Sequence, residues 1–325
     1  MTTKHELATR KKTADTKFTG KIGLPNVSVL CRGRLVGSNK LPLLSGGMIL
    51  RVFVPRICDG YDSGVVARIV KVALEESRKR KLNISLITLP SGVGLIREAP
   101  FSIQSPRRPD ADEVEQHARD WATRLSAKLV DHPPIILGLD GYTAPDVVGI
   151  QLAVGIEKGC DPTVTWKSLP MSNERSTLVT LWGPPNTTPP PNSLTNNHPV
   201  VGVGNVRALM LVCHDSTAFA GHATHNANND TWTGVFHKQY DDLIKIKTIN
   251  FAINLIHRLP RNAGGRMMTS PIFQSGHTSL RKHDIPVIAV AGLNNKCRSA
   301  AFKKLNRLLA CDFRHLDLRI DVTSS

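Results

Sequence analysis

Residues 48–89, MILRVFVPRICDGYDSGVVARIVKVALEESRKRKLNISLITL, decide the fold class of this chain. The stretch opens with the apolar segment 48–55, which is rich in β-branched and aromatic residues and predicts a strand. In residues 63–81 the apolar side chains recur every three or four positions, as on one face of a helix. Segment 83–89 (NISLITL) predicts the next strand. Strand, helix and strand in this order indicate an α/β sheet with a helix crossover.

The same alternation continues along the rest of the chain. Apolar runs predict further strands, and acids placed early with a lysine placed late predict a helix at 110–129. Apolar residues at helical spacing predict another helix at 241–257, and a basic helix is expected at 299–309. The predicted strands are 134–139, 148–156, 208–212, 286–291 and 316–322. We therefore expect mixed sheets with helix crossovers.

Composition shifts divide the chain into an arm and one large unit. Residues 1–24 carry Lys, Thr and Arg without hydrophobic period, which predicts a disordered, flexible basic arm. Residues 25–325 are expected to form a single α/β domain. Six prolines fall within the seventeen residues 183–199, a density that fits neither helix nor strand. This Pro-rich segment is either a long surface loop or a linker between halves.

The net charge of +16 gathers at the two ends of the chain. Residues 1–45 hold nine Lys/Arg against two acids, and residues 257–325 hold twelve against four. Clustered cations release counterions when they bind nucleic acid, so the termini predict a polyanion partner. The alternative is a solvated face that keeps the protein soluble. A homo-oligomer also stays open.

Cysteine spacing and hydropathy indicate a soluble, cytoplasmic protein. The six cysteines lie far apart without a CxxC pair, which is typical of reduced thiols. No apolar run approaches the roughly 18 residues that a membrane-spanning helix needs. Residues 1–21 lack the apolar core of a secretory signal.

Reactive side chains follow the buried strand 208–212. In open α/β sheets, ligands bind where strands end, and here Cys213, His214 and Asp215 come directly after the strand. A cysteine becomes nucleophilic when a neighbouring base lowers the pKa of its thiol. Because neighbouring strand residues point to opposite faces, His222 or His225 is the expected base. Otherwise, Cys213 is a small buried residue.

Metal binding is a second interpretation of the same segment. His222 and His225 are three positions apart, a spacing that places two side chains on one face of a helical turn, with His214 or Asp215 as a third ligand. Elsewhere, Asp140 ends a strand and Glu157 follows the next one, a pairing that nucleases use to hold a divalent ion. The favoured explanation of the two acids is that Asp140 opens a turn and Glu157 is solvated at a strand end. We predict no cofactor, with a divalent metal left open.

Further residues are candidates for binding a substrate. Arg261 and Arg266 lie in the loop-like segment 258–266 and are candidates for an anion clamp through bidentate guanidinium contacts. Asp140 and Trp232 are expected to complete the substrate-binding set. No Gly-rich nucleotide-binding motif occurs in the sequence.

Residues 211–219 (LVCHDSTAF) resemble the nucleophile region of the nitrilase, or carbon–nitrogen hydrolase, superfamily. In that superfamily an apolar strand ends in a catalytic cysteine, with an acid and a Phe soon after. The resemblance implies a four-layer αββα fold and a Glu–Lys–Cys triad that hydrolyses amides. Lys167 is available as the lysine, whereas Ser91 follows Leu89 and Pro90 where the superfamily has a Pro-Glu step.

Two functions from different classes follow. The first is a hydrolase, acting on a C–N bond of a small-molecule amide, with Cys213 as nucleophile; a degenerate, non-catalytic relative is its variant. The second is a nucleic-acid-binding protein, or a metal-dependent nuclease, that grips phosphates with its basic termini.

Overall fold

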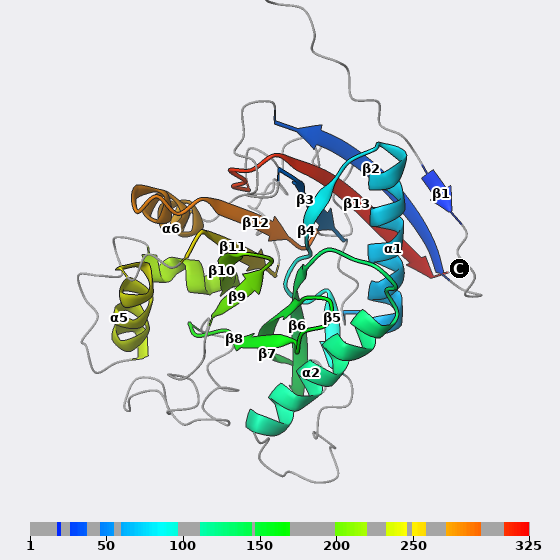
Figure 1. The fold of residues 1–325 in the computed structure, drawn as a ribbon. Helices are drawn as coiled ribbons and strands as arrows, with labels where there is room; N and C mark the ends of the chain where they lie inside the picture. The colour runs from blue at the N-terminus through cyan, green and yellow to red at the C-terminus, as the bar shows by residue number, and fades with distance from the viewer. Residues whose placement is uncertain are drawn as a thin grey trace, which may run out of the picture.

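The computed structural model describes residues 18–20, 27–37, 46–54, 60–96, 111–144, 147–169, 199–219, 232–245, 249–257, 271–293 and 309–324. Within these ranges the chain forms two β-sheets and four α-helices (Figure 1), which confirms the predicted mixed α/β class. Of the predicted basic arm, the structure describes only Phe18–Gly20, which forms strand β1. The predicted Pro-rich loop, apart from Pro199, and the predicted helix at 299–309, apart from its last residue, lie outside the described ranges.

The larger sheet contains the strands predicted from residues 48–89. Its order is β1-β2-β13-β3-β4-β6-β7-β8, and β5 pairs with β6 beside this path. β13, β3, β4 and β6 run parallel to one another, while β7 and β8 return antiparallel. After β1 the bounds are β2 Val27–Val36, β3 Met48–Phe53, β4 Ile84–Thr88, β5 Gly94–Ile96, β6 Ile135–Ala144, β7 Val147–Ile156, β8 Thr163–Trp166 and β13 His315–Ser324.

The smaller sheet has four strands in the order β12-β11-β10-β9. β10, β11 and β12 run parallel, and β9 pairs antiparallel with β10. β11 and β12 are buried along their whole length, which is why their sequences are almost continuous apolar runs rather than alternating ones, with Asn254 of β11 as the one polar residue. The bounds are β9 Val200–Val203, β10 Val206–Val212, β11 Phe251–Ile256 and β12 Val287–Ala291.

Alternation along the strands stacks these elements in four layers. On β3, Leu50 and Val52 belong to a core shared with the helices, while Ile49 and Phe53 face a second core shared with the smaller sheet. On β10, Leu209 likewise belongs to the core shared with the helices. Helices α1 and α2 therefore cover the larger sheet, and α5 and α6 cover the smaller one (Figure 1). The bounds are α1 Ser63–Lys79, α2 Ala111–Ala127, α5 Trp232–Lys245 and α6 Pro271–Lys282.

The predicted helix at 241–257 is wrong for its second half. Helix α5 ends at Lys245, and Phe251–Ile256 forms the central strand β11 of the smaller sheet. A strand buried on both faces is apolar at nearly every position, so the isoleucines of β11 also match a helical period. This correction moves His257 from a helix to the end of a parallel strand.

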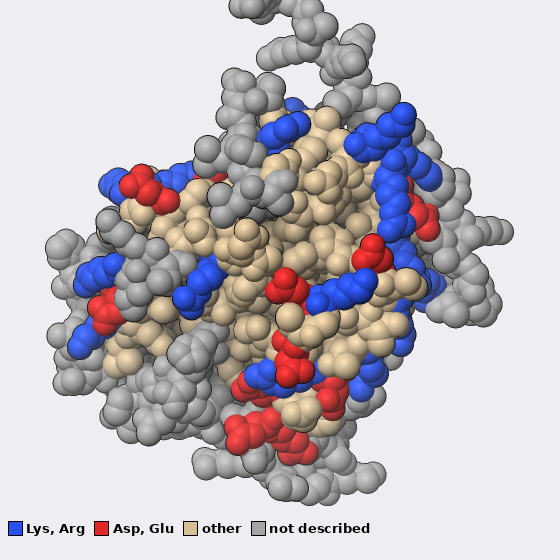
Figure 2. Space-filling view, viewed as in Figure 1, with Lys and Arg blue, Asp and Glu red and all other residues tan. Residues whose placement is uncertain are grey.

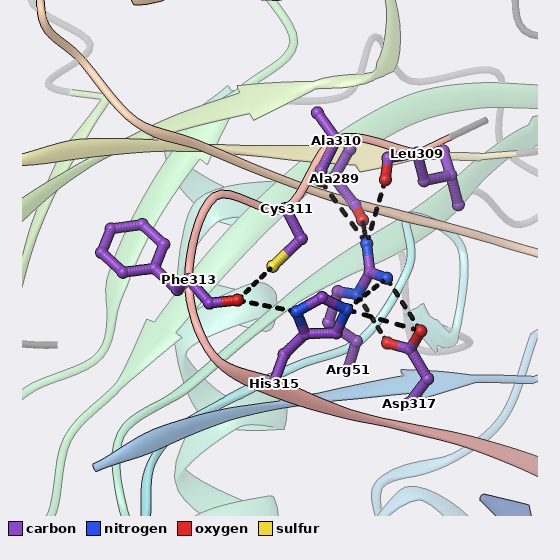
Figure 3. Close-up of polar contacts among 8 residues, drawn as sticks. All are labelled: Arg51, Ala289, Leu309, Ala310, Cys311, Phe313, His315 and Asp317. Carbon is purple, nitrogen blue, oxygen red and sulfur yellow. Dashed lines mark hydrogen bonds and ion pairs between the residues drawn. The ribbon is translucent and has the colours of Figure 1, made fainter. Parts of the chain in front are cut away.

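A buried ion pair joins the two sheets at the face of β3 that is directed toward the smaller sheet (Figure 3). Arg51, 0% exposed, donates through Nε to Asp317 Oδ1 at 2.7 Å and through Nη2 to Asp317 Oδ2 at 2.9 Å. Its Nη1 donates to the Ala289 carbonyl of β12 at 2.8 Å. Nη2 also lies 3.1 Å from His315 Nε2, while His315 Nδ1 donates to the Phe313 carbonyl at 2.7 Å. The guanidinium thus connects β3, β12 and β13.

Candidate active site

Cys213 occupies a sharp turn between a buried strand and a short helix. It follows β10 directly and begins a 3₁₀ helix, η1, over Cys213–Phe219. Its φ of 50° lies in the left-handed region. Among the described residues, two more non-glycine residues have a left-handed backbone, Lys81 and Asp284. Both follow the ends of helices, where this conformation is ordinary. At a strand end, strain of this kind is typical of functional sites and presents the side chain at the top of the sheet.

Asp215 fixes the position of this turn. Its Oδ1 accepts hydrogen bonds from the backbone N–H groups of Ser168 at 2.9 Å and Leu169 at 2.7 Å. Its Oδ2 accepts from Val212 N at 3.1 Å. Burial raises the pKa of Asp215 to about 7, although these N–H groups and the Lys167 cation favour the charged carboxylate. Asp215 therefore binds the segment that carries Lys167 to the turn that carries Cys213.

Lys167 is a buried cation at the same end of the structure. Its side chain is 5% exposed, and Nζ donates to Gln151 Oε1 at 2.8 Å. Gln151 pairs with Asp140 across β6 and β7, and Lys167 N donates to the Gln151 carbonyl. Asp140, Gln151 and Lys167 thus form one row across three neighbouring strands. Alternation along β7 directs this row toward the smaller sheet, because Leu152 faces the helices.

An aspartate–histidine pair crosses from one sheet to the other beside this row. His257 Nε2 lies 2.6 Å from Asp140 Oδ2, with side chains 15% and 1% exposed. Asp140 belongs to β6 of the larger sheet, and His257 follows β11 of the smaller sheet. The loop after β4 lies against the pair at Gly92. Ser91, 2% exposed, places a buried hydroxyl without a hydrogen-bond partner in the same loop.

We expect that any side chain at position 92 destabilises the fold, because Gly92 lies against Asp140 and His257. Its φ is 73°, and a Cβ there would meet Asp140 Oδ2 at 2.6 Å and the His257 ring at 2.7 Å. Gly159 has a similar φ of 78° but no atom within 4 Å of a Cβ position, so it is a matched control. We expect Gly92→Ala to cost about 1–3 kcal/mol more in the free energy of unfolding than Gly159→Ala, measured by urea denaturation. Equal costs would show that the contact with the pair is unimportant.

The described residues include part of the predicted site. Cys213, His214 and Asp215 lie in η1, Asp140 lies in β6, and Trp232 is the first residue of α5. The proposed bases and anion clamp stay predictions, because they lie outside the described residues: His222, His225, Arg261 and Arg266.

Sequence reasoning missed several residues of this arrangement. His257 was hidden by the helix predicted at 241–257, although it follows an apolar run that ends as a strand would. Gln151 carried no signal, because an amide in an apolar strand has no motif of its own. Within the described ranges, no group of three or more His, Cys, Asp or Glu side chains is arranged to hold a metal ion. In the same ranges, none of the helices combines the length and apolarity that a membrane span requires.

Comparisons with known proteins return carbon–nitrogen hydrolases at the level of fold. No protein-family model matches the chain, and a search of curated proteins finds no match. Among solved structures, the chain is similar to a carbon–nitrogen hydrolase from Helicobacter pylori G27, with 13% identity, TM-score 0.44, and coverage of 84% of this chain and 89% of that one. It is also similar to Nit3 of Saccharomyces cerevisiae, a member of branch 10 of the nitrilase superfamily, with 11% identity, TM-score 0.37, and coverage of 84% and 89%.

A third similar structure is a CN-hydrolase superfamily protein from Xanthomonas campestris with an arsenic adduct in its active site. The identity is 10%, the TM-score is 0.35, and the coverage is 84% of this chain and 90% of that one. All three belong to the superfamily that residues 211–219 resemble. With TM-scores below 0.5, these likenesses carry no argument about activity, which has to come from the residues of this chain.

Proposed function

We propose that the chain is a hydrolase that cleaves the carbon–nitrogen bond of an amide, with Cys213 as nucleophile. The observation that carries this proposal is the backbone of Cys213, which adopts a φ of 50° at the end of a buried strand. Three backbone hydrogen bonds to Asp215 maintain the turn. A protein that used Cys213 only to fill its core would not need a left-handed backbone there, because a small apolar residue fits an ordinary strand end.

The reaction has two steps on the same sulfur atom. In the first, the Cys213 thiolate attacks the amide carbonyl carbon, an S–C bond forms, and the C–N bond breaks as the amine leaves with a proton. In the second, water attacks the thioester, the S–C bond breaks, and a carboxylic acid is released. Negative charge develops on the carbonyl oxygen in both steps. We assign its stabilisation to the buried Lys167 cation, because fixed charges act strongly where water is excluded.

Alkylation by iodoacetamide tests this assignment without a known substrate. Cys213 and Cys311 are 6% and 5% exposed, so burial alone predicts similar rates for the two thiols. We expect Cys213 to be labelled at least about tenfold faster at pH 7, because a thiolate reacts and a thiol does not. Mass spectrometry of the two peptides over time measures both rates. Equal rates would favour a degenerate, non-catalytic relative.

A second function, polyanion binding, is favoured by the surface over α1. Helix α1 and the two residues after it contain six Lys/Arg against two Glu. Figure 2 shows Lys and Arg gathered along the side of the molecule where α1 lies. Lys71, Arg78 and Lys81 are exposed there. This surface adds a folded element to the predicted basic termini.

Charge reversal on α1 tests the second function. We expect the triple variant Lys71→Glu/Arg78→Glu/Lys81→Glu to weaken binding to duplex DNA and to reduce the salt dependence by a slope of roughly 3, since each lost phosphate contact removes about 0.9. Fluorescence anisotropy across a salt series measures both. The control reverses three exposed lysines elsewhere, Lys158, Lys238 and Lys245. Equal losses in the two triple variants would indicate a response to net charge alone.

A further inference from the structure

His257 of the aspartate–histidine pair and Cys213 follow the ends of two neighbouring parallel strands. β10 and β11 are parallel neighbours, and Val212 pairs with Leu255 at the ends of the two strands. Cys213 and His257 follow this pair by one and two residues, so the two side chains emerge at the same end of the same sheet. The elements that place them are among the most buried in the protein. Rigid strands hold reacting groups more accurately than loops do.

The geometry of the pair fixes which nitrogen of His257 can accept a proton. Nε2 faces the Asp140 carboxylate at 2.6 Å, so Nε2–H donates and Nδ1 is the accepting nitrogen of the neutral ring. The Asp140 carboxylate is 1% exposed and is held against the ring by this contact. Asp140 therefore orients the ring, which is one task of the acid in a nucleophile–base–acid arrangement.

Two loops, one after β4 and one after β12, lie against this pair and leave little freedom for it to move. After β4, a Cβ on Gly92 would meet both members of the pair. After β12, a Cβ on Gly292 would meet the His257 carbonyl oxygen at 2.4 Å. Ser91, in the loop after β4, lies against Gly138 of β6. A serine hydroxyl is too weak a base to take a proton as a carboxylate does. The acid–base group of this site has to come from elsewhere, and the pair supplies one.

We infer that His257 is the general base and acid of the proposed hydrolase, and that Asp140 is its positioning residue. This inference rests on the proposed function. His257 Nδ1 takes the proton from the Cys213 thiol and returns it to the leaving amine as the C–N bond breaks. It then takes a proton from the attacking water and returns it to the sulfur as the thioester is cleaved, so the protein ends the cycle unchanged. Other described titratable side chains at this end of the sheets are Lys167, Asp215 and Tyr240.

The test is the pH profile of Cys213 alkylation by iodoacetamide in the full-length protein. We expect His257→Gln to slow labelling at pH 7 by at least about tenfold and to move the profile to higher pH, because the thiolate loses its cationic partner. Asp140→Asn should move the profile in the same direction by a smaller amount, since it keeps the shape of the side chain. Melting curves identify variants that fail to fold, and Asp140→Asn is the second readout if His257→Gln is among them.

The control is His132→Gln, which removes another buried histidine. His132 is 7% exposed, lies 3.2 Å from Ser126 Oγ, and precedes β6 at the start of that strand rather than at its end. We expect its profile to match the wild type. A wild-type profile in both His257→Gln and Asp140→Asn, with Cys213 still reactive, would overturn the assignment of the base and leave the hydrolase intact. A wild-type Cys213 no more reactive than Cys311 would overturn both.

Discussion

Cys213→Ala is expected to abolish amide hydrolysis, lowering kcat/KM by at least about 10³-fold once an amide substrate is in hand. Alanine removes the only atom that forms the covalent bond to the substrate, while the backbone hydrogen bonds of Asp215 keep the turn in place. Ammonia or amine release from a panel of small amides measures the loss. The panel itself identifies the substrate class, because only amides that enter the site are turned over.

The controls separate the nucleophile from other effects of losing a thiol. Cys311→Ala removes an equally buried thiol from the other end of the inter-sheet core and should leave turnover unchanged. Cys213→Ser replaces the thiol with a hydroxyl of similar shape. Its activity should also be lost, since a serine beside a base arranged for a thiol is a weak nucleophile. Turnover by Cys213→Ala at the wild-type rate would remove Cys213 from the mechanism.

Arg51→Met is expected to have the largest effect on stability, lowering the free energy of unfolding by about 3–5 kcal/mol. The substitution leaves the Asp317 carboxylate, 2% exposed, charged and without its bidentate partner inside the protein. It also removes the hydrogen bond to the Ala289 carbonyl, which connects the two sheets (Figure 3). Urea denaturation followed by circular dichroism measures the change.

Two variants show whether burial is the cause. Arg281 forms a similar bidentate pair with Asp312, at 2.9 and 2.8 Å, but its side chain is 42% exposed. Arg281→Met should cost no more than about 1 kcal/mol, because water screens an exposed pair. Arg51→Met/Asp317→Leu should recover much of the loss, since the unpaired charge is gone. A loss below 1 kcal/mol in Arg51→Met would contradict this account.

The same pair makes stability depend on acid pH. Burial alone would favour the neutral form of Asp317, but the Arg51 guanidinium and His315 outweigh burial and lower the pKa of Asp317 to about 2. A carboxyl whose pKa is lower in the folded state than in the unfolded chain stabilises the fold above the unfolded value. This contribution is therefore lost as the pH falls from about 4 to about 2.

Much of the fold follows from local patterns in the sequence. The apolar β3 and β4 segments enclose a helix whose first N–H groups are capped by Asp62. Strict alternation in β13 also predicted a strand with two different faces. Leu316 and Leu318 face the helix layer, whereas Asp317 faces the smaller sheet. Local periodicity succeeds for these elements because each keeps one chemical character per face.

The sequence failed where burial removes the period. β11 is buried on both faces and almost wholly apolar, so no pattern distinguishes it from a buried helix, and the histidine that follows it was not recognised. Arg51 gave a similar problem, because a charged residue within a predicted strand carries no indication of which distant carboxylate will neutralise it. Its partner is 266 residues away.

By itself, the sequence determined the α/β class, the strand that ends at Cys213 and the basic character of α1, because each depends on residues that are near neighbours in the chain. Only the tertiary structure decided that Asp140 pairs with His257, that Asp215 binds the backbone beside Lys167, and that these groups meet at one end of two sheets. Such contacts join residues 117 and 46 positions apart. They arise because parallel strands of both sheets end together, which is a property of the packed layers and not of any segment alone.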